Sequence, residues 1–100
     1  GSRFAGCINL DLSGVSDVFN IGGSSALSTF SGCTSLTSIN NVSQWNVSSI
    51  TNMEQMFYGC INLNIDLSNW NVSNVTRCGG FAFNTPKWTL PKPNFTNCTP

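Results

Sequence analysis

The sequence predicts an α/β repeat protein: a short solenoid with one short strand and one short helix per unit, followed by an irregular C-terminal tail. The pattern F-x-G-C-x-x-L, in which x is any residue, starts at Phe4, Phe30 and Phe57, so its copies are 26 and 27 residues apart. A second block, W-N-V-S, starts at Trp45 and Trp70. Two separate blocks that keep their order and spacing indicate a true internal repeat, and such a repeat determines the fold.

The strand of each unit is expected after the F-x-G-C pattern. Leu63, Ile65 and Leu67 alternate with polar Asn64 and Asp66. Because successive side chains of a strand point to opposite faces, this alternation places three apolar side chains on one face. The segment 63–67 is therefore a predicted strand.

The helix of the unit is expected just before the next F-x-G-C pattern. Ile50, Met53 and Phe57 recur at i, i+3 and i+7, which is the spacing of one helical face. Gly59 can end that helix in a left-handed conformation. One such unit cannot bury its apolar face alone, but stacked copies can share a continuous core.

The period of about 26 residues falls within the 20–29 residues of leucine-rich repeats. The runs Trp45–Phe57 (WNVSSITNMEQMF) and Leu67–Thr76 (LSNWNVSNVT) resemble the 26-residue repeat of BspA-type leucine-rich-repeat surface proteins. The resemblance covers residues 30–80 well and residues 4–30 loosely. It implies a leucine-rich-repeat-like solenoid at a surface, with a role in adhesion or molecular recognition.

The predicted domain organisation is a solenoid over residues 1–84 and a Pro-rich cap or tail over residues 85–100. The solenoid divides into about three repeats, 4–29, 30–56 and 57–83. The first repeat lacks the Trp, and the third carries Arg77-Cys78-Gly79-Gly80 where a helix is expected, which is poor helix sequence. Whether residues 85–100 cap the array or act as a linker stays open at this point.

The charge of the chain is low and balanced, with four Lys and Arg against four Asp and Glu among 100 residues. Nucleic-acid binding depends on clustered Lys and Arg, so no nucleic-acid partner is expected. No apolar run approaches the roughly 20 residues that span a bilayer. Hydroxyl and amide groups dominate the polar positions, which favours an extracellular, cell-surface or virion-surface location.

Five cysteines fall into two groups. Cys7, Cys33 and Cys60 occupy one repeat position, so we expect a ladder of buried thiols; a disulfide within it would need neighbouring units in suitable geometry. Cys78 and Cys98 lie outside the ladder and are disulfide candidates in an exported protein. The chain has no C-x-x-C pair and no His, so neither a metal site nor a cofactor is expected.

Six N-x-S/T triplets are candidate N-glycosylation sites: Asn41, Asn46, Asn71, Asn74, Asn94 and Asn97. Most arise from the repeat pattern itself, so the competing interpretation is that these side chains make turn or ladder hydrogen bonds. Glycans require a eukaryotic secretory route, and Asn94 and Asn97 would then be the most accessible acceptors.

Catalysis is not expected, and no catalytic residue is assigned. The chain has no His, the usual base near neutral pH. Asp11 and Asp66 occupy matching repeat positions two units apart, too far to face one substrate as a glycosidase pair does. Trp45, Trp70 and Trp88 are candidate interface residues, although the repeat-equivalent pair can equally belong to the core.

Two functions follow as hypotheses. The first is a non-enzymatic recognition module that binds a protein or glycan through its strand face or loops. The second is a structural component of an extracellular filament, surface layer or virion, which packs against sister subunits.

Overall fold

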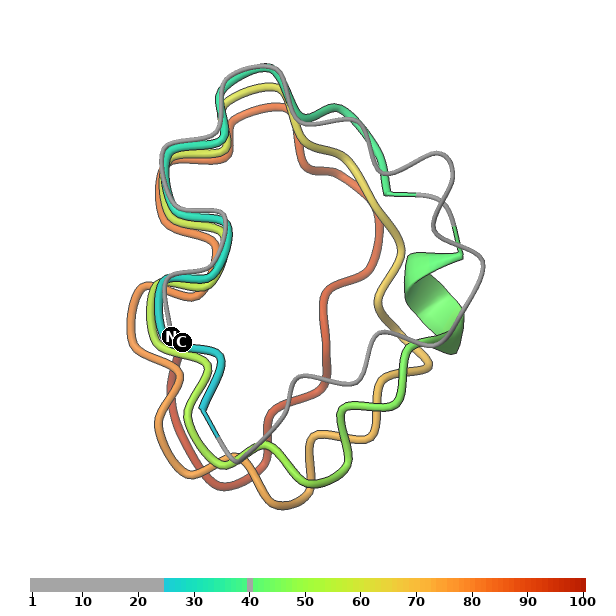
Figure 1. The fold of residues 1–100 in the computed structure, drawn as a ribbon, viewed down its shortest axis with the longest axis vertical. Coiled ribbons are helices and arrows are strands. Elements are labelled where there is room, and N and C mark those ends of the chain that lie inside the picture. The colour runs from blue at the N-terminus through green and yellow to red at the C-terminus, as the bar shows by residue number, and fades with distance from the viewer. Residues whose placement is uncertain (1–24, 40) are drawn as a thin grey trace.

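The computed structural model describes residues 25–39 and 41–100, and Figure 1 shows this part of the chain as coils that overlie one another. Parallel β-bridges join Ser25 to Asn52 and Asn52 to Arg77, which marks the same position in successive coils. We call residues 25–51 coil one, 52–76 coil two and 77–100 coil three. Cys7 and most of the predicted repeat 4–29 lie outside the described residues.

One side of every coil is a series of tandem β-turns. In coil two, the amide of Met56 donates to the carbonyl of Met53 at 3.3 Å, and that of Cys60 to the carbonyl of Phe57 at 3.1 Å. Gln55, the third residue of the first turn, has a φ of 54°, which a type II turn requires at that position. The equivalent left-handed residues are Ser28, Gly32, Gly59, Gly80 and Asn84. We call this side, residues 26–33, 53–60 and 78–85, the turn stack.

Backbone hydrogen bonds between coils hold the turn stack together. Every second amide of coil two donates to coil three at 2.7 to 3.0 Å, and coil one donates to coil two in the same way. The donors of coil two are Met53, Gln55, Phe57 and Gly59, and their acceptors are the carbonyls of Arg77, Gly79, Phe81 and Phe83. The amides between them close the turns, so hydrogen bonds between coils and hydrogen bonds within turns alternate along the chain.

The helix expected around Ile50–Phe57 is not formed. Among residues 25–39 and 41–100 the helical element is η1, a 3-10 helix at Val42–Gln44. Tandem turns with a four-residue repeat bury positions i, i+3, i+4 and i+7, and Met53, Met56, Phe57 and Cys60 are all fully buried. A helical face buries the same spacing, so the apolar periodicity does not distinguish the two structures.

The strand expected over residues 63–67 is also absent as a regular element, although its pattern of burial is present. Leu63, Ile65 and Leu67 are at most 4% exposed. The carboxamide oxygen of Asn64, between them, accepts two amides of coil three, each at 2.9 Å. These side-chain bonds occupy backbone groups that a regular strand would pair with backbone.

Coils one and two differ in length by two residues, and the difference is confined to one part of the circuit. The rings of Phe30 and Phe57, 27 residues apart, stack with centroids 5.3 Å apart. The rings of Trp45 and Trp70, 25 residues apart, stack at 6.4 Å. The extra length of coil one therefore lies between Phe30 and Trp45, and Figure 1 shows η1 there, across the coil from the turn stack.

Residues 85–100 run alongside coil two and stay in contact with it. The amide of Leu67 donates to the carbonyl of Pro91 at 2.9 Å. The side chain of Asn97 donates to the carbonyl of Ser73 at 2.7 Å. Trp88 is buried, with its ring edge-on to Phe57 at 5.5 Å. The Pro-rich segment thus completes coil three and packs against the core.

Candidate interaction surface

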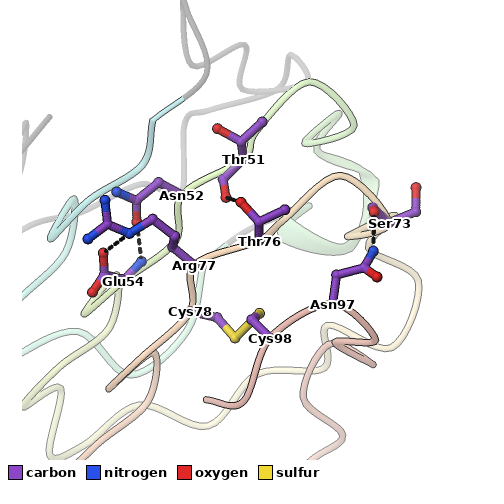
Figure 2. The surroundings of a disulfide bond; sticks show 9 residues. All are labelled: Thr51, Asn52, Glu54, Ser73, Thr76, Arg77, Cys78, Asn97 and Cys98. Carbon is purple, nitrogen blue, oxygen red and sulfur yellow. Dashed lines mark hydrogen bonds and ion pairs between the residues drawn. A yellow bond between two sulfur atoms is a disulfide. The ribbon is translucent and has the colours of Figure 1, made fainter.

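The two described carboxylates have structural partners. Glu54 forms an ion pair with Arg77 at 2.9 Å, which Figure 2 shows beside Asn52. Asp66 accepts hydrogen bonds from the backbone amide and hydroxyl of Ser68, and these hold the pKa of Asp66 below its usual value. Within residues 25–39 and 41–100 no cluster of His, Cys, Asp and Glu could hold a metal ion. No helix in that part of the chain has the length and apolar character needed to cross a bilayer.

Cys33 and Cys60 are buried cysteines that form no disulfide and occupy equivalent positions of the turn stack. The thiol of Cys60 donates to the carbonyl of Phe30 at 3.0 Å. Burial raises the pKa of Cys60 to about 12, so this thiol stays protonated and unreactive in the folded chain. In coil three the same register places Thr85 at this position, and its hydroxyl donates to the carbonyl of Ala82 at 2.6 Å.

Cys78 and Cys98 form a disulfide, which Figure 2 shows between the beginning and the end of coil three. The bond closes a loop with a sequence separation of 20 residues. A cross-link of this length restricts the unfolded chain and stabilises the folded one by about 3 kcal/mol in the chain-entropy model. The disulfide therefore fixes coil three as a closed loop.

Three triplets of the repeat make the same turn. In each, the first side chain accepts both the amide and the hydroxyl of the serine two residues on, as in an Asx-turn. The accepting residues are Asn46, Asp66 and Asn71. Asp66 cannot carry an N-linked glycan and yet makes the turn, so the triplet has a structural role that is independent of modification.

Two further asparagines bridge successive coils. The side-chain nitrogen of Asn74 donates to the carbonyl of Ser48, and that of Asn97 to the carbonyl of Ser73, both at 2.7 Å. This nitrogen is the atom to which an N-linked glycan attaches, so modification would replace one of its two N–H groups and place a sugar beside the bridge. Asn41 and Asn94 are exposed.

The three tryptophans lie in the core and present no ring face to a partner. Trp45 and Trp70 are each 4% exposed and Trp88 is 5% exposed. The indole nitrogen of Trp70 donates to the carbonyl of Val42 at 2.7 Å. That of Trp88 is buried and has no hydrogen-bond partner in the described part of the chain. Of the two interpretations from sequence, core and interface, their burial fits the core.

The turn stack instead exposes two other aromatic side chains. The rings of Tyr58 and Phe83 stack with centroids 5.4 Å apart and planes 17° apart. Tyr58 is 39% exposed and Phe83 is 62% exposed. We call this pair the aromatic ledge. Tyr58 is the variable residue of the F-x-G-C pattern, so an apolar residue at that outward position is the sequence signal that could have revealed the ledge.

A hollow of about 250 Å³ adjoins the ledge on coil three. Its lining consists of Gly80, Phe81, Ala82, Phe83, Lys92 and Pro100. The ammonium group of Lys92 lies 5.0 Å from the centre of the Trp88 ring, a cation–π arrangement. The hollow thus combines small residues, an exposed ring and a positive charge.

The described residues thus form stacked coils with structural asparagines and an exposed aromatic ledge. Comparison with known families gives its membership. The chain belongs to the family described as "Mycoplasma protein of unknown function, DUF285", which matches residues 24–91. No curated protein and no solved structure shows a significant match.

Proposed function

We propose that this chain is a non-enzymatic recognition module of a surface-displayed, BspA-type leucine-rich-repeat solenoid, and that it binds a protein or glycan through the aromatic ledge. Membership in the DUF285 family and the resemblance of the W-N-V-S runs to BspA-type repeats support this proposal. The polar, weakly charged composition and the disulfide support an extracellular location, because disulfides persist in oxidising compartments.

The single observation that carries the proposal is the exposure of Tyr58 and Phe83. Burying one such side chain against a partner contributes roughly 1.5–3 kcal/mol. The two rings already stack on each other, so binding would immobilise them at a small additional entropic cost. Aromatic side chains of this kind are enriched among the residues that dominate binding energy.

The experiment is a binding screen of the 100-residue chain against a glycan array and a panel of purified extracellular-matrix proteins. The double variant Tyr58→Ser/Phe83→Ser should lose roughly tenfold or more in affinity for any specific ligand. Leu90→Ser is the matched control, since Leu90 is 42% exposed and lies outside the turn stack. The proposal fails if no ligand binds specifically, or if the double variant binds as well as the control.

A second candidate function is a structural subunit of a filament, surface layer or virion. The observation that favours it is a set of backbone amides on coil three that lack acceptors among the described residues. These amides belong to the same ladder that joins the coils to one another, so they suit contact with a further coil.

A further inference from the structure

One face of the Tyr58 ring is not covered by a neighbouring ring. The hydrogen bonds between coils set Ser31, Tyr58 and Phe83 at the same position in coils one, two and three. Phe83 stacks on one face of the Tyr58 ring, with the centroids 5.4 Å apart. Tyr58 is nevertheless 39% exposed, although coil two has a neighbouring coil on both sides. The side chain of Ser31 is too small to cover the second face, which we call the open face of Tyr58.

A glycine of coil three helps to fix the direction of this face. A Cβ atom added at Gly80 would lie 3.8 Å from Cδ2 of Tyr58, so the Tyr58 ring lies close to coil three. Its open face is therefore turned toward coil one, where Ser31 is half-buried. The hydroxyl of Ser31 has no hydrogen-bond partner among the described residues, so it is free to bind a ligand at this face.

Two further neutral polar side chains lie beside the open face. Ser28 and Gln55 close the turns that lead to it, because their carbonyls accept the amides of Ser31 and Tyr58, each at 3.2 Å. The hydroxyl of Ser28 donates to Oε1 of Gln55 at 3.4 Å. The side-chain nitrogen of Gln55 has no partner among the described residues. The open face thus has hydroxyl and carboxamide groups at its border.

The charges near the open face favour a neutral ligand. Glu54 is the charged residue of the turn stack, and it is paired with Arg77 at 2.9 Å. Lys92 lines the hollow beside Phe83 in coil three, whereas the open face is turned toward coil one. An ionised ligand would therefore find no unpaired opposite charge at the open face.

We propose that the open face of Tyr58 binds a sugar ring of a neutral glycan. One face of a pyranose ring presents C–H groups, whose partial positive charge is attracted to the negative face of an aromatic ring. The hydroxyl groups around the sugar need donors and acceptors, which Ser31 and Gln55 supply. An apolar side chain of a protein would fill the same face but would leave these polar groups without partners. The inference rests on the proposed function, because it names the ligand class of the aromatic ledge.

A titration followed by ¹⁹F NMR tests the ligand class. Tyr58 is the one tyrosine of the 100-residue chain, so labelling with 3-fluorotyrosine gives a single signal at the site. The probes are neutral tetrasaccharides of glucose, N-acetylglucosamine and mannose, with tetragalacturonate as the acidic comparison. At least one neutral probe should shift the signal saturably, with a dissociation constant on the order of 1 mM, as expected for one sugar ring on one aromatic face. Tetragalacturonate should bind no more tightly.

The variant Ser31→Phe tests the location. Rings already occupy this position in coils two and three, so the fold accepts a ring there. The new ring should stack on the open face, shift the ¹⁹F signal without ligand, and weaken binding at least roughly tenfold. Asn69→Phe is the matched control, because it adds the same ring at an exposed position outside the turn stack and should bind like the unmodified chain.

A second variant keeps the test decisive if the introduced ring does not stack. Tyr58→Ser places at this position the residue that coil one already has there, and it removes the open face outright. Calorimetry with the best neutral probe should then show a loss of affinity of at least roughly tenfold.

Three outcomes would overturn the inference: no neutral probe shifts the signal, tetragalacturonate binds most tightly, or Ser31→Phe and Tyr58→Ser both bind as well as Asn69→Phe. A protein ligand that depends on Tyr58 and Phe83, found while the neutral probes fail, would overturn the glycan assignment and leave the proposed recognition function in place. The absence of any specific ligand would overturn both.

Discussion

Coils two and three follow the same path but are held in place by different means. Coil two is hydrogen-bonded to a neighbour on both faces of the turn stack and contains no covalent cross-link. Coil three is bonded to coil two on one face and adds the Cys78–Cys98 disulfide and buried Trp88. Coil two can therefore draw stability from two neighbouring coils, whereas coil three has one neighbour among the described residues and a covalent cross-link of its own.

Removing the disulfide tests this difference most strongly. The double variant Cys78→Ala/Cys98→Ala should lose about 3 kcal/mol of unfolding free energy, because the unfolded chain regains the freedom that the cross-link removes. Urea denaturation measures the loss. Thr99→Ala, at an exposed neighbouring position, should stay within about 0.5 kcal/mol of the unmodified chain. If the double variant behaves like Thr99→Ala, coil three needs no covalent reinforcement.

A pair of tryptophan variants compares hydrogen bonding in the two coils. Trp70→Phe removes the indole N–H that donates to the carbonyl of Val42 at 2.7 Å, so the carbonyl loses this hydrogen bond. Trp88→Phe removes a buried indole N–H that has no partner in the described chain. Both variants lose similar apolar area, so Trp70→Phe should be the more destabilising by about 1–2 kcal/mol. Thermal or urea unfolding provides the comparison. Equal losses would show that the bond in coil two contributes nothing measurable.

The smallest expected effect concerns Asp66 in coil two. Its folded-state pKa is lowered by Ser68, so its stabilising contribution is present above the ordinary pKa of 3.8 and is lost as pH falls through the folded value. Asp66→Asn retains an acceptor for the Asx-turn and removes this titration. The melting temperature of the variant should therefore fall less than that of the unmodified chain as pH decreases below about 4. Identical pH profiles would assign the acid sensitivity to other carboxylates.

The repeat and much of the core could be predicted from the sequence. Phe30, Phe57, Leu63 and Trp70 are buried where the pattern places them, and Gly59 has the expected left-handed φ, at 73°. These features depend on local spacing and on the conformational freedom of glycine, both of which are visible in one sequence. The equivalence of the motifs was therefore sufficient to align successive coils.

The tandem turns could not be predicted in the same way. Ser28 and Gln55 have φ values of 55° and 54° without being glycine, which is uncommon for such residues. The adjoining hydrogen bonds between coils, such as that from the amide of Gln55 to the carbonyl of Gly79 at 3.0 Å, accompany this conformation. Such bonds join residues far apart in sequence, so local propensity gives no sign of them.

The candidate surfaces also differ in how much of them could be predicted from the sequence. Tyr58 could have been found as an apolar residue at an outward position of the pattern, but its stacking on Phe83 depends on how coil three aligns with coil two. The amides of coil three that lack acceptors among the described residues could be predicted from the sequence still less. They become visible only when the acceptor of every backbone amide in the turn stack has been accounted for.

The two-residue difference between coils one and two, taken up near η1, has a consequence for how this repeat can vary. On the turn stack, inserting one residue would exchange the amides that face the next coil with those that close the turns, and every bond beyond the insertion would lose its partner. Around η1 the chain gains or loses residues without disturbing that alternation. Variation in repeat length is therefore confined to one arc of the coil, and that arc is where new loops could be added while the stack remains in register.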